Sequence, residues 1–416
     1  MEYNPFDREV IRDPYPSYAR LRREAPVCRT PLGFAAVSRY EDVLEVLRRP
    51  DAFSSSALAD LIQGVKALSP EDLGQGETLL GSDPPVHTRL RKIVNRAFTP
   101  RRIASLEPRI RAIAEGLVAG IPGGSVCDLM AALAVPLPVT VIAEILGIDP
   151  ERREDFKRWS EEILAAVAGA PTPELRARLE RSFLERAAYL EEVVEDRKRC
   201  PRDDVISALV QAEQEGGAMT EDEVGDFIVL LLVAGNETTT NLIGNALLAA
   251  LGHPHLLETI VLDLSLVPAL VEETLRYDSP VQLTFRRARE DVELAGEKVR
   301  EGEVVGLLLG SANRDERHFP DPDRFDLVRE RAAHLAFGFG THFCLGATLA
   351  RLEARVALEA LLSRFRRFEL VDREIERAPS LITRGAKALL LRVGLSQGDT
   401  PRDQSAYAVP SATSWW

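Results

Sequence analysis

The chain has 416 residues, of which 45% are hydrophobic and 28% are charged, and this is the composition of a soluble globular protein with a large core. Its 52 basic and 65 acidic residues give a net charge of −13, which argues against a nucleic-acid binder. The four cysteines form no CxxC pair and are sparse, which argues against a zinc ribbon, a dithiol redox centre and a secreted disulfide scaffold.

The N-terminus and the apolar runs indicate a protein of the cytoplasm. The first ten residues carry charges and no apolar stretch, so they do not resemble a signal peptide. The longest apolar run, 227–235, is much shorter than the roughly 20 residues that span a bilayer. We therefore expect no membrane span and a cytoplasmic location.

Helical periodicity dominates the chain, so the expected fold class is mostly α with a small β region. Thr220 and Glu223 form a capping-box pattern, which predicts a long helix over 221–251, ending before Pro254. The other predicted helices cover 86–98, 101–120, 139–147, 151–169, 173–198, 203–215, 266–277 and 345–367. A hairpin is predicted at 25–38, and strands at 281–286, 291–294, 303–309 and 386–393.

Two segments fit no regular element. Loop 54–82 is long and rich in serine and glycine, which is typical of a functional lid or of disorder. Residues 396–416 show turn-type residues without a period, which predicts a flexible tail, with docking of its aromatic end onto a groove as the alternative. No linker interrupts the rest, so residues 1–395 are expected to form a single domain.

One cysteine lies in a glycine-bracketed loop directly before a predicted helix. At such a place the helix dipole and the free backbone N–H groups favour a thiolate at Cys344. Gly338 and Gly340 permit positive φ and a close approach of the backbone to a flat ligand, and His342 adds a hydrogen-bond donor. Cys344 is therefore a candidate nucleophile or the single thiolate ligand of a haem iron.

This loop resembles the haem-binding loop of the cytochrome P450 family, Phe-Gly-x-Gly-x-His-x-Cys-x-Gly. All specified positions match, and they are Phe337, Gly338, Gly340, His342, Cys344 and Gly346. The resemblance implies that Cys344 is the axial ligand, and so the metal ligand, of a haem b cofactor, with O2 as co-substrate. It also implies the cytochrome P450 fold, in which haem lies between the helix over 221–251 and the helix after Cys344.

A second resemblance concerns charged residues that lie before the cysteine loop. Glu273 and Arg276 are three residues apart on one helix face and match the family's Glu-x-x-Arg motif. Arg324, in Pro-Asp-Arg-Phe, matches the third member of the family's Glu–Arg–Arg cluster. The resemblance implies a structural role for these three side chains, and a buried cluster of this kind needs a partner for every charge.

A third motif interrupts the apolar run of the long helix with polar residues. Thr238 is placed to donate to the carbonyl of Ala234, and Gly235 weakens the same turn, so the helix is expected to open there. The segment resembles the oxygen-activation motif of cytochromes P450. By that match Glu237 is the acid and Thr238 the hydroxyl that deliver protons, while Ala234 and Gly235 border the haem.

A fourth motif suits a carboxylate ligand. His87 and Arg91 are four residues apart, so they project from one helix face. The cytochrome P450 family uses such a pair for a haem propionate. Arg286 and His342 match the family's other propionate contacts.

The resemblance also implies an apolar substrate pocket. By family position its lining comes from loop 54–82 and from Leu230, Val233, Val281, Gln282, Leu283, Thr284 and Ile382. The implied substrate is a medium-sized lipophile such as a terpenoid, steroid, fatty acid or polyketide, which is hydroxylated or epoxidised.

The electrons must come from a partner, because the chain has no dinucleotide fingerprint, flavin domain or iron–sulfur cysteine cluster. The resemblance implies a separate ferredoxin or flavodoxin, and such acidic carriers are steered by a basic face. The basic residues expected on that face are Lys92, Arg96, Arg101, Arg102 and Arg351.

Three alternatives remain beside the monooxygenase. They are an H2O2-driven peroxygenase, a non-catalytic haem-thiolate binding or sensor protein, and a non-haem enzyme with a nucleophilic cysteine. The intact Glu237–Thr238 pair argues against the first two, because neither requires a proton relay for O2. The joint presence of four ordered motifs argues against the third.

Overall fold

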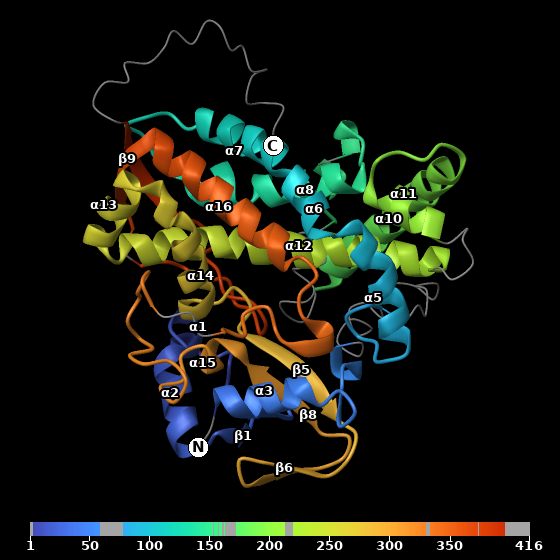
Figure 1. Cartoon of the computed structure of the whole chain (residues 1–416), viewed down its shortest axis with the longest axis vertical. Helices are drawn as coiled ribbons and strands as arrows, with labels where there is room; N and C mark the ends of the chain where they lie inside the picture. The colour runs from blue at the N-terminus through green and yellow to red at the C-terminus, as the bar shows by residue number, and fades with distance from the viewer. Residues whose placement is uncertain are drawn as a thin grey trace, which may run out of the picture.

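The structure is a computed structural model, and it describes residues 3–58, 78–152, 154–156, 158–159, 162, 172–212, 219–329, 333–372 and 374–395. Figure 1 shows helices gathered around the long helix α12 (Glu221–Leu251), and a smaller part with the main sheet at the other end of the long axis. The mostly helical fold class with a small β region is confirmed. The central parts of loop 54–82 (59–77) and the tail 396–416 lie outside the described residues.

The helices cover most of the chain. Those of the N-terminal half are α1 (Arg8–Arg12), α2 (Tyr15–Glu24), α3 (Tyr40–Arg48), α5 (Val86–Ala97), α6 (Pro100–Ser105), α7 (Glu107–Ala119) and α8 (Pro136–Leu146). Those of the C-terminal half are α10 (Pro173–Arg199), α11 (Val205–Ala212), α12, α13 (Pro254–Leu262), α14 (Val267–Tyr277), α15 (Leu309–Ala312) and α16 (Ala347–Arg364). Short π or 3-10 turns cover Met130–Ala134, Pro150–Arg152, Leu264–Leu266 and Gly340–His342.

Helix α12 begins and ends where its sequence predicts. The Thr220 hydroxyl accepts from the Glu223 N–H, and the Glu223 carboxylate accepts from the Thr220 N–H, which completes the capping box. The helix packs against α8, α14 and α16. Its stretch from Glu223 to Leu251 is long and apolar enough to cross a bilayer, but 61% of its most apolar window is buried inside the protein, as in a core helix.

The strands form three sheets. The main sheet has the order β1 (Val27–Arg29), β2 (Phe34–Val37), β8 (Val304–Leu308), β5 (Leu283–Ala288), β3 (Phe53–Ser54). Only the β2–β8 pair is parallel in it. The second has the order β4 (Val126–Asp128), β10 (Leu390–Leu395), β9 (Phe365–Leu370), and β6 (Val292–Leu294) pairs with β7 (Glu297–Val299).

Several sequence expectations need correction. Helices α1, α2 and α3 were not expected, and 101–120 is two helices with a break at Leu106, because Pro108 starts a new first turn. The helix expected over 345–367 ends at Arg364, and the chain turns into β9. The strand expected at 386–393 is β10, which begins four residues later and ends two residues later. Most of 151–171 and residues 213–215 lie outside the described part of the chain.

Candidate haem-thiolate site

The cysteine loop is held in a tight turn ahead of α16. The Cys344 N–H donates to the Phe337 carbonyl at 3.0 Å, which closes the loop. Gly338 and Gly340 both have positive φ (71° and 69°), the conformation that glycine adopts without strain. Gly346 caps α16, and a Cβ built there would meet nothing within 4 Å, which leaves open space beside the cysteine.

Opposing influences act on the Cys344 thiol. Burial raises its pKa, while the N–H groups of Gly346 and Ala347 and the charges of Arg91 and Arg351 lower it. No group of three or more His, Cys, Asp or Glu side chains among the described residues is arranged to hold a metal ion. The loop itself offers one thiolate, which is the kind of ligand that haem iron takes from a cysteine.

Two histidines from distant segments meet near the cysteine loop. The ring centroids of His87, on α5, and His342 lie 4.1 Å apart. The His342 Nε2 is hydrogen-bonded to the Ser55 Oγ at 2.9 Å. His87 is only 1% exposed, yet neither of its ring nitrogens has a partner among the described residues. Buried polar atoms are rarely left unpaired, so the ring nitrogens of His87 are available to hydrogen-bond a ligand.

Two arginines complete this cluster. The buried Arg286 on β5 donates to the Phe285 carbonyl at 2.6 Å, and no described carboxylate lies within ion-pair distance of it. Burial lowers its pKa to about 10, and the charge of Asp83 opposes this. Arg91 donates to Asn95 and likewise forms no ion pair with a described residue. Arginines without carboxylate partners, beside an unpaired histidine, fit an anionic ligand such as the haem propionates.

Sequence reasoning missed two residues that shape this cluster. The Asp83 carboxylate accepts from the Ser54 hydroxyl, from the Ser55 N–H at 2.9 Å and from Arg289 at 2.5 Å. Asp83 thereby links Ser55, the hydrogen-bond partner of His342, to the start of α5. Asp83 lies directly before Pro84, Pro85 and the helix predicted over 86–98.

The polar motif of α12 differs in one respect from the expectation. The Thr238 hydroxyl does donate to the Ala234 carbonyl at 2.7 Å, but α12 continues through this turn as a regular α-helix. Every residue of this turn is α-helical, so the predicted opening of the helix is not found. Gly235 faces α8, where a Cβ would come 3.1 Å from the Ile142 Cδ1, so its small size serves helix packing.

One stripe of α12 remains accessible although the helix is central. Leu230, Val233, Glu237 and Thr238 are half-buried and Ala234 is exposed, and these residues share one helix face. Glu237 accepts a 2.7 Å hydrogen bond from the Thr383 hydroxyl. Burial raises the pKa of Glu237, and its hydrogen bonds with Thr383 and Asn241 lower it.

Two of the expected substrate-lining residues face elsewhere. Leu283 is 1% exposed and packs into the apolar cluster of Tyr18, Phe34 and Phe285, because alternate residues of a strand point to opposite faces and Arg286 has the other parity. The Gln282 amide donates to the Ser279 carbonyl and to the Tyr15 hydroxyl, so its side chain is part of the core. Thr284 shares the face of Arg286 and is half-buried.

The remaining two expected lining residues, Val281 and Ile382, come from two segments that lie side by side. Val281 forms an isolated antiparallel bridge with Thr383, next to Ile382, and both Val281 and Ile382 are half-buried. Their main chains are joined further where the Gln282 N–H donates to the Ile382 carbonyl at 2.7 Å.

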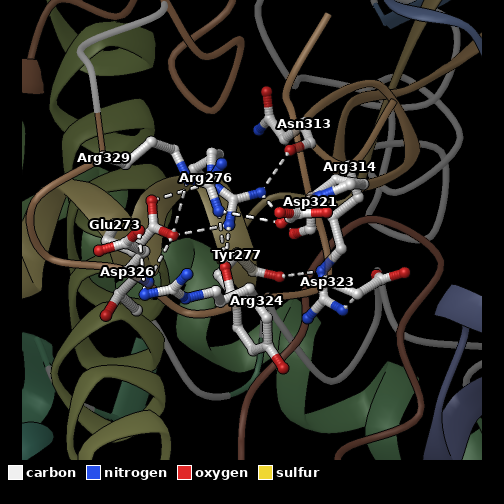
Figure 2. A network of polar contacts seen from close by, with 12 residues as sticks. Glu273, Arg276, Tyr277, Asn313, Arg314, Asp321, Asp323, Arg324, Asp326 and Arg329 are labelled. Atoms are coloured by element: carbon white, nitrogen blue, oxygen red, sulfur yellow. Dashed lines mark hydrogen bonds and ion pairs between the residues drawn. The ribbon is translucent and has the colours of Figure 1, made fainter. Parts of the chain in front are cut away.

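The Glu273–Arg276 pair is bidentate and buried. The two nitrogens of Arg276 lie 2.8 and 2.7 Å from the Glu273 oxygens, and Arg276 also donates to the carbonyls of Asn313, Pro322 and Arg324 (Figure 2). Every charge of the pair is thus compensated by hydrogen bonds, which a buried ion pair requires.

The prediction that Arg324 is the third member of this cluster is wrong. The Arg324 side chain is 70% exposed, and its one ion pair with a described residue is the 3.7 Å contact with Asp326. Arg329 takes the expected place, because its Nε lies 3.2 Å from the Glu273 Oε1 and its guanidinium also binds the carbonyls of Pro320, Asp321 and Arg324 (Figure 2). Arg324 contributes its carbonyl rather than its charge.

The basic residues expected to face a partner fall into two sets. Arg351 forms a 2.5 Å ion pair with Glu272 and lies over the Phe337 ring, and Arg102 pairs with Asp203 at 3.0 Å. Lys92, Arg96 and Arg101 are exposed. A surface groove of about 900 Å³ lies beside the cysteine loop, and its lining includes Phe337, Phe343, Arg351 and Arg355.

Comparison with known proteins shows the family of this chain. The cytochrome P450 family model matches residues 169–391. "Cytochrome P450 107B1" of Saccharopolyspora erythraea is 41% identical over 405 residues, which cover 94% of this chain and 97% of that protein. "Vitamin D(3) 25-hydroxylase" of Pseudonocardia autotrophica is 40% identical over 367 residues, 87% and 89% of the two chains.

A solved structure extends the agreement to the fold. The structure of cytochrome P450 CYP109Q5 from Chondromyces apiculatus has a TM-score of 0.88 and 48% sequence identity, and the match covers 95% of this chain and 99% of that one. Identity at this level over nearly the whole length shows common family membership, beyond a shared fold. The chain therefore belongs to the cytochrome P450 family and is a haem-thiolate monooxygenase that uses O2.

Proposed function

We propose that the enzyme inserts one oxygen atom of O2 into a C–H bond of a lipophilic substrate of roughly steroid size. The observation that carries the proposal is the cluster of His87, Arg91 and Arg286, whose polar atoms lack carboxylate partners among the described residues, beside the Cys344 loop. A substrate of steroid size is favoured because a vitamin D(3) hydroxylase is 40% identical to this chain. Epoxidation of a double bond is the related outcome at the same site.

The residues divide the work as follows. Haem b, bound through Cys344, supplies O2 activation, a chemistry that protein side chains lack. His87, Arg91, Arg286 and His342 bind and orient its propionates through charge-assisted hydrogen bonds. Glu237 and Thr238 hold and move the protons that O2 reduction consumes, because a positioned acid lowers the barrier to proton transfer.

The substrate lies against the accessible stripe of α12 and the paired segments around Val281 and Ile382. Leu230, Val233 and Ile382 supply apolar contact, and Thr284 offers a hydroxyl that can orient a polar group. This lining has few polar groups, which suits a largely apolar body.

A separate ferredoxin or flavodoxin supplies the electrons, and the protein acts in the cytoplasm. The groove beside the cysteine loop offers Phe343, which is 43% exposed, while the charges of its Arg351 and Arg355 are paired with Glu272 and Glu107. The exposed Lys92 and Arg101 are the cations that suit an acidic carrier.

The test is the CO-difference spectrum of the dithionite-reduced holoenzyme. We expect a Soret band at about 450 nm, the mark of thiolate ligation, and its loss in Cys344→Ala. Cys28→Ala, which removes another buried cysteine, is the matched control and should keep the band. A normal band in Cys344→Ala would contradict the ligand assignment.

Turnover then separates the oxidants. Product formed with a ferredoxin, its reductase and O2, but not with H2O2 alone, supports the monooxygenase. Product formed equally well from H2O2 alone would show a peroxygenase instead.

A further inference from the structure

Three polar residues of α12 face the segment 377–385 near the C-terminus. Glu237, Asn241 and Asn245 are four residues apart, so they form a ladder along one face of the helix. At its far end the Asn245 amide donates to the Arg384 carbonyl at 2.9 Å, and the Asn245 Oδ1 accepts from Arg377 at 2.7 Å. The segment thus runs directly beside α12.

The middle of the ladder shows how close this approach is. A Cβ built on Gly385 would lie 1.7 Å from the Asn241 Oδ1, so no other residue fits there without a shift. At the near end the Thr383 hydroxyl donates to the Glu237 Oε1 at 2.7 Å. Glu237 is therefore in contact with the same segment that carries Ile382 of the proposed substrate lining.

The backbone of Thr383 is fixed from the other side. The Arg384 guanidinium binds Asp278 at 2.8 Å and the carbonyls of Ile11 and Arg12 at 2.9 and 3.0 Å. The Arg384 N–H also donates to the Pro280 carbonyl at 2.8 Å. With its neighbour anchored in this way, Thr383 presents its hydroxyl to α12 at a fixed position.

Ser380 sets the direction of the Thr383 hydroxyl. The Ser380 Oγ accepts from the N–H groups of Ile382 at 3.3 Å and Thr383 at 3.0 Å, and it lies 2.9 Å from the Thr383 Oγ1. Ser380 thereby holds both the main chain and the hydroxyl oxygen of Thr383 in place. From this position the Thr383 hydroxyl donates to the Glu237 Oε1.

We propose that Thr383 is the positioning residue of Glu237: its hydroxyl, oriented by Ser380, holds the carboxylate against the substrate-lining segment and so makes proton delivery depend on that segment. The inference rests on the proposed role of Glu237 in proton delivery. Thr238 cannot replace Thr383 in this arrangement, because its own proton is donated to Ala234. The charged residues Arg377 and Arg384 of the segment both bind Asp278, so the Thr383 hydroxyl is the group of this segment that holds the acid, together with Asn241 of α12.

The first test compares Thr383→Val with Thr383→Ser in the holoenzyme. Valine keeps the shape and removes the hydroxyl, so we expect product formed per O2 consumed to fall about fivefold, with a matching rise in H2O2 release. Serine keeps the hydroxyl and should restore the ratio to within about twofold of the wild type. An unchanged ratio in Thr383→Val would overturn the proposal.

A second readout does not depend on turnover. The infrared band of the Glu237 carboxyl is identified by its loss in Glu237→Gln. Because the hydrogen bond from Thr383 lowers the pKa of Glu237, the titration midpoint of this band should rise in Thr383→Val. Ser380→Ala, which leaves Thr383 in place, should raise the midpoint less. No shift in either variant means that the hydroxyl does not hold the acid.

A double-mutant cycle separates this inference from the proposed function. In the Glu237→Gln background, Thr383→Val should cause no further loss of coupling, because the group it positions is gone. A persistent fivefold loss would show that Thr383 acts on the substrate directly. If Glu237→Gln itself leaves coupling unchanged, the proton-delivery role fails, and the infrared shift still decides whether Thr383 holds the acid.

Discussion

Arg324 and Arg329 lie five residues apart in one loop, yet only Arg329 reaches the buried Glu273. The loop determines the choice, because the carbonyls of Pro320, Asp321 and Arg324 all turn toward the Arg329 guanidinium. Charge type and spacing do not reveal which of two arginines a folded loop turns inward.

Arg329→Met should destabilise the holoenzyme by about 3 kcal/mol, since it removes one partner of a buried ion cluster. Arg324→Met is the matched control and should change the free energy of unfolding by no more than about 0.5 kcal/mol, because its side chain is exposed. Urea unfolding of both variants measures the difference. Equal losses would show that the two arginines contribute equally.

His87→Leu should speed haem release. The buried ring nitrogens of His87 have no partner among the described residues, so their replacement leaves none of these residues unpaired. Loss of charge-assisted bonds to a propionate is expected to raise the rate of haem transfer to an excess scavenger protein about tenfold. His255→Leu, whose side chain is fully exposed, should leave this rate as in the wild type.

At the residue scale, the sequence predicts which segments meet at the site better than it predicts side-chain direction. Cys344, His87, His342 and Arg286 do come together, because their motifs are local and their elements are well defined. The prediction that Leu283 lines the substrate pocket is wrong, because the strand parity of Arg286, three residues on, turns Leu283 to the opposite face. That parity was available in the sequence.

Helix α12 shows what local sequence determines at the element scale. Its ends follow from the capping box at Thr220 and from Gly252 before Pro254. The break at Leu106 and the turn from α16 into β9 were missed, although Pro108 indicates the first. The second depends on pairing with β10, a partner distant in sequence, and periodicity carries no information about it.

Two glycine-to-alanine changes should have opposite effects on stability. Gly116 lies on the exposed side of α7, and an added Cβ would meet nothing within 4 Å, so Gly116→Ala should stabilise the protein by about 0.5–1 kcal/mol. Gly385→Ala should destabilise it by about 1–3 kcal/mol, because the new methyl would displace Asn241. Thermal unfolding of the two holoenzyme variants checks the signs, and a neutral Gly385→Ala would mean that the segment stands off from α12.

At the scale of the whole molecule, the net charge of −13 conceals a local basic set. Lys92, Arg96 and Arg101 are exposed on α5 and α6, and Arg102 and Arg351 form ion pairs with acids that are distant in the sequence. The sequence could not distinguish these sets, because their acidic partners are 101 residues away for Arg102 and 79 for Arg351.

The double variant Lys92→Glu/Arg101→Glu should slow reduction by an acidic ferredoxin about tenfold at low ionic strength. The effect should largely disappear at about 1 M salt, where exposed charges are screened beyond roughly 3 Å. Lys298→Glu, on the β6–β7 hairpin at the lower end of the molecule in Figure 1, away from α5 and α6, is the control. Stopped-flow measurement of the reduction rates tests this prediction. A tenfold loss of rate in the control as well would show that the added negative charge repels the ferredoxin wherever it is placed.

The ladder between α12 and the segment around Thr383 limits how this enzyme can be re-engineered. A mutant library that randomised 380–385 to admit new substrates would also alter the hydroxyl beside Glu237 and the anchor at Arg384. Many members would then bind a new molecule and waste electrons as peroxide. Libraries confined to Leu381 and Ile382, with Ser380, Thr383 and Arg384 fixed, would vary the apolar surface and leave these hydrogen bonds intact.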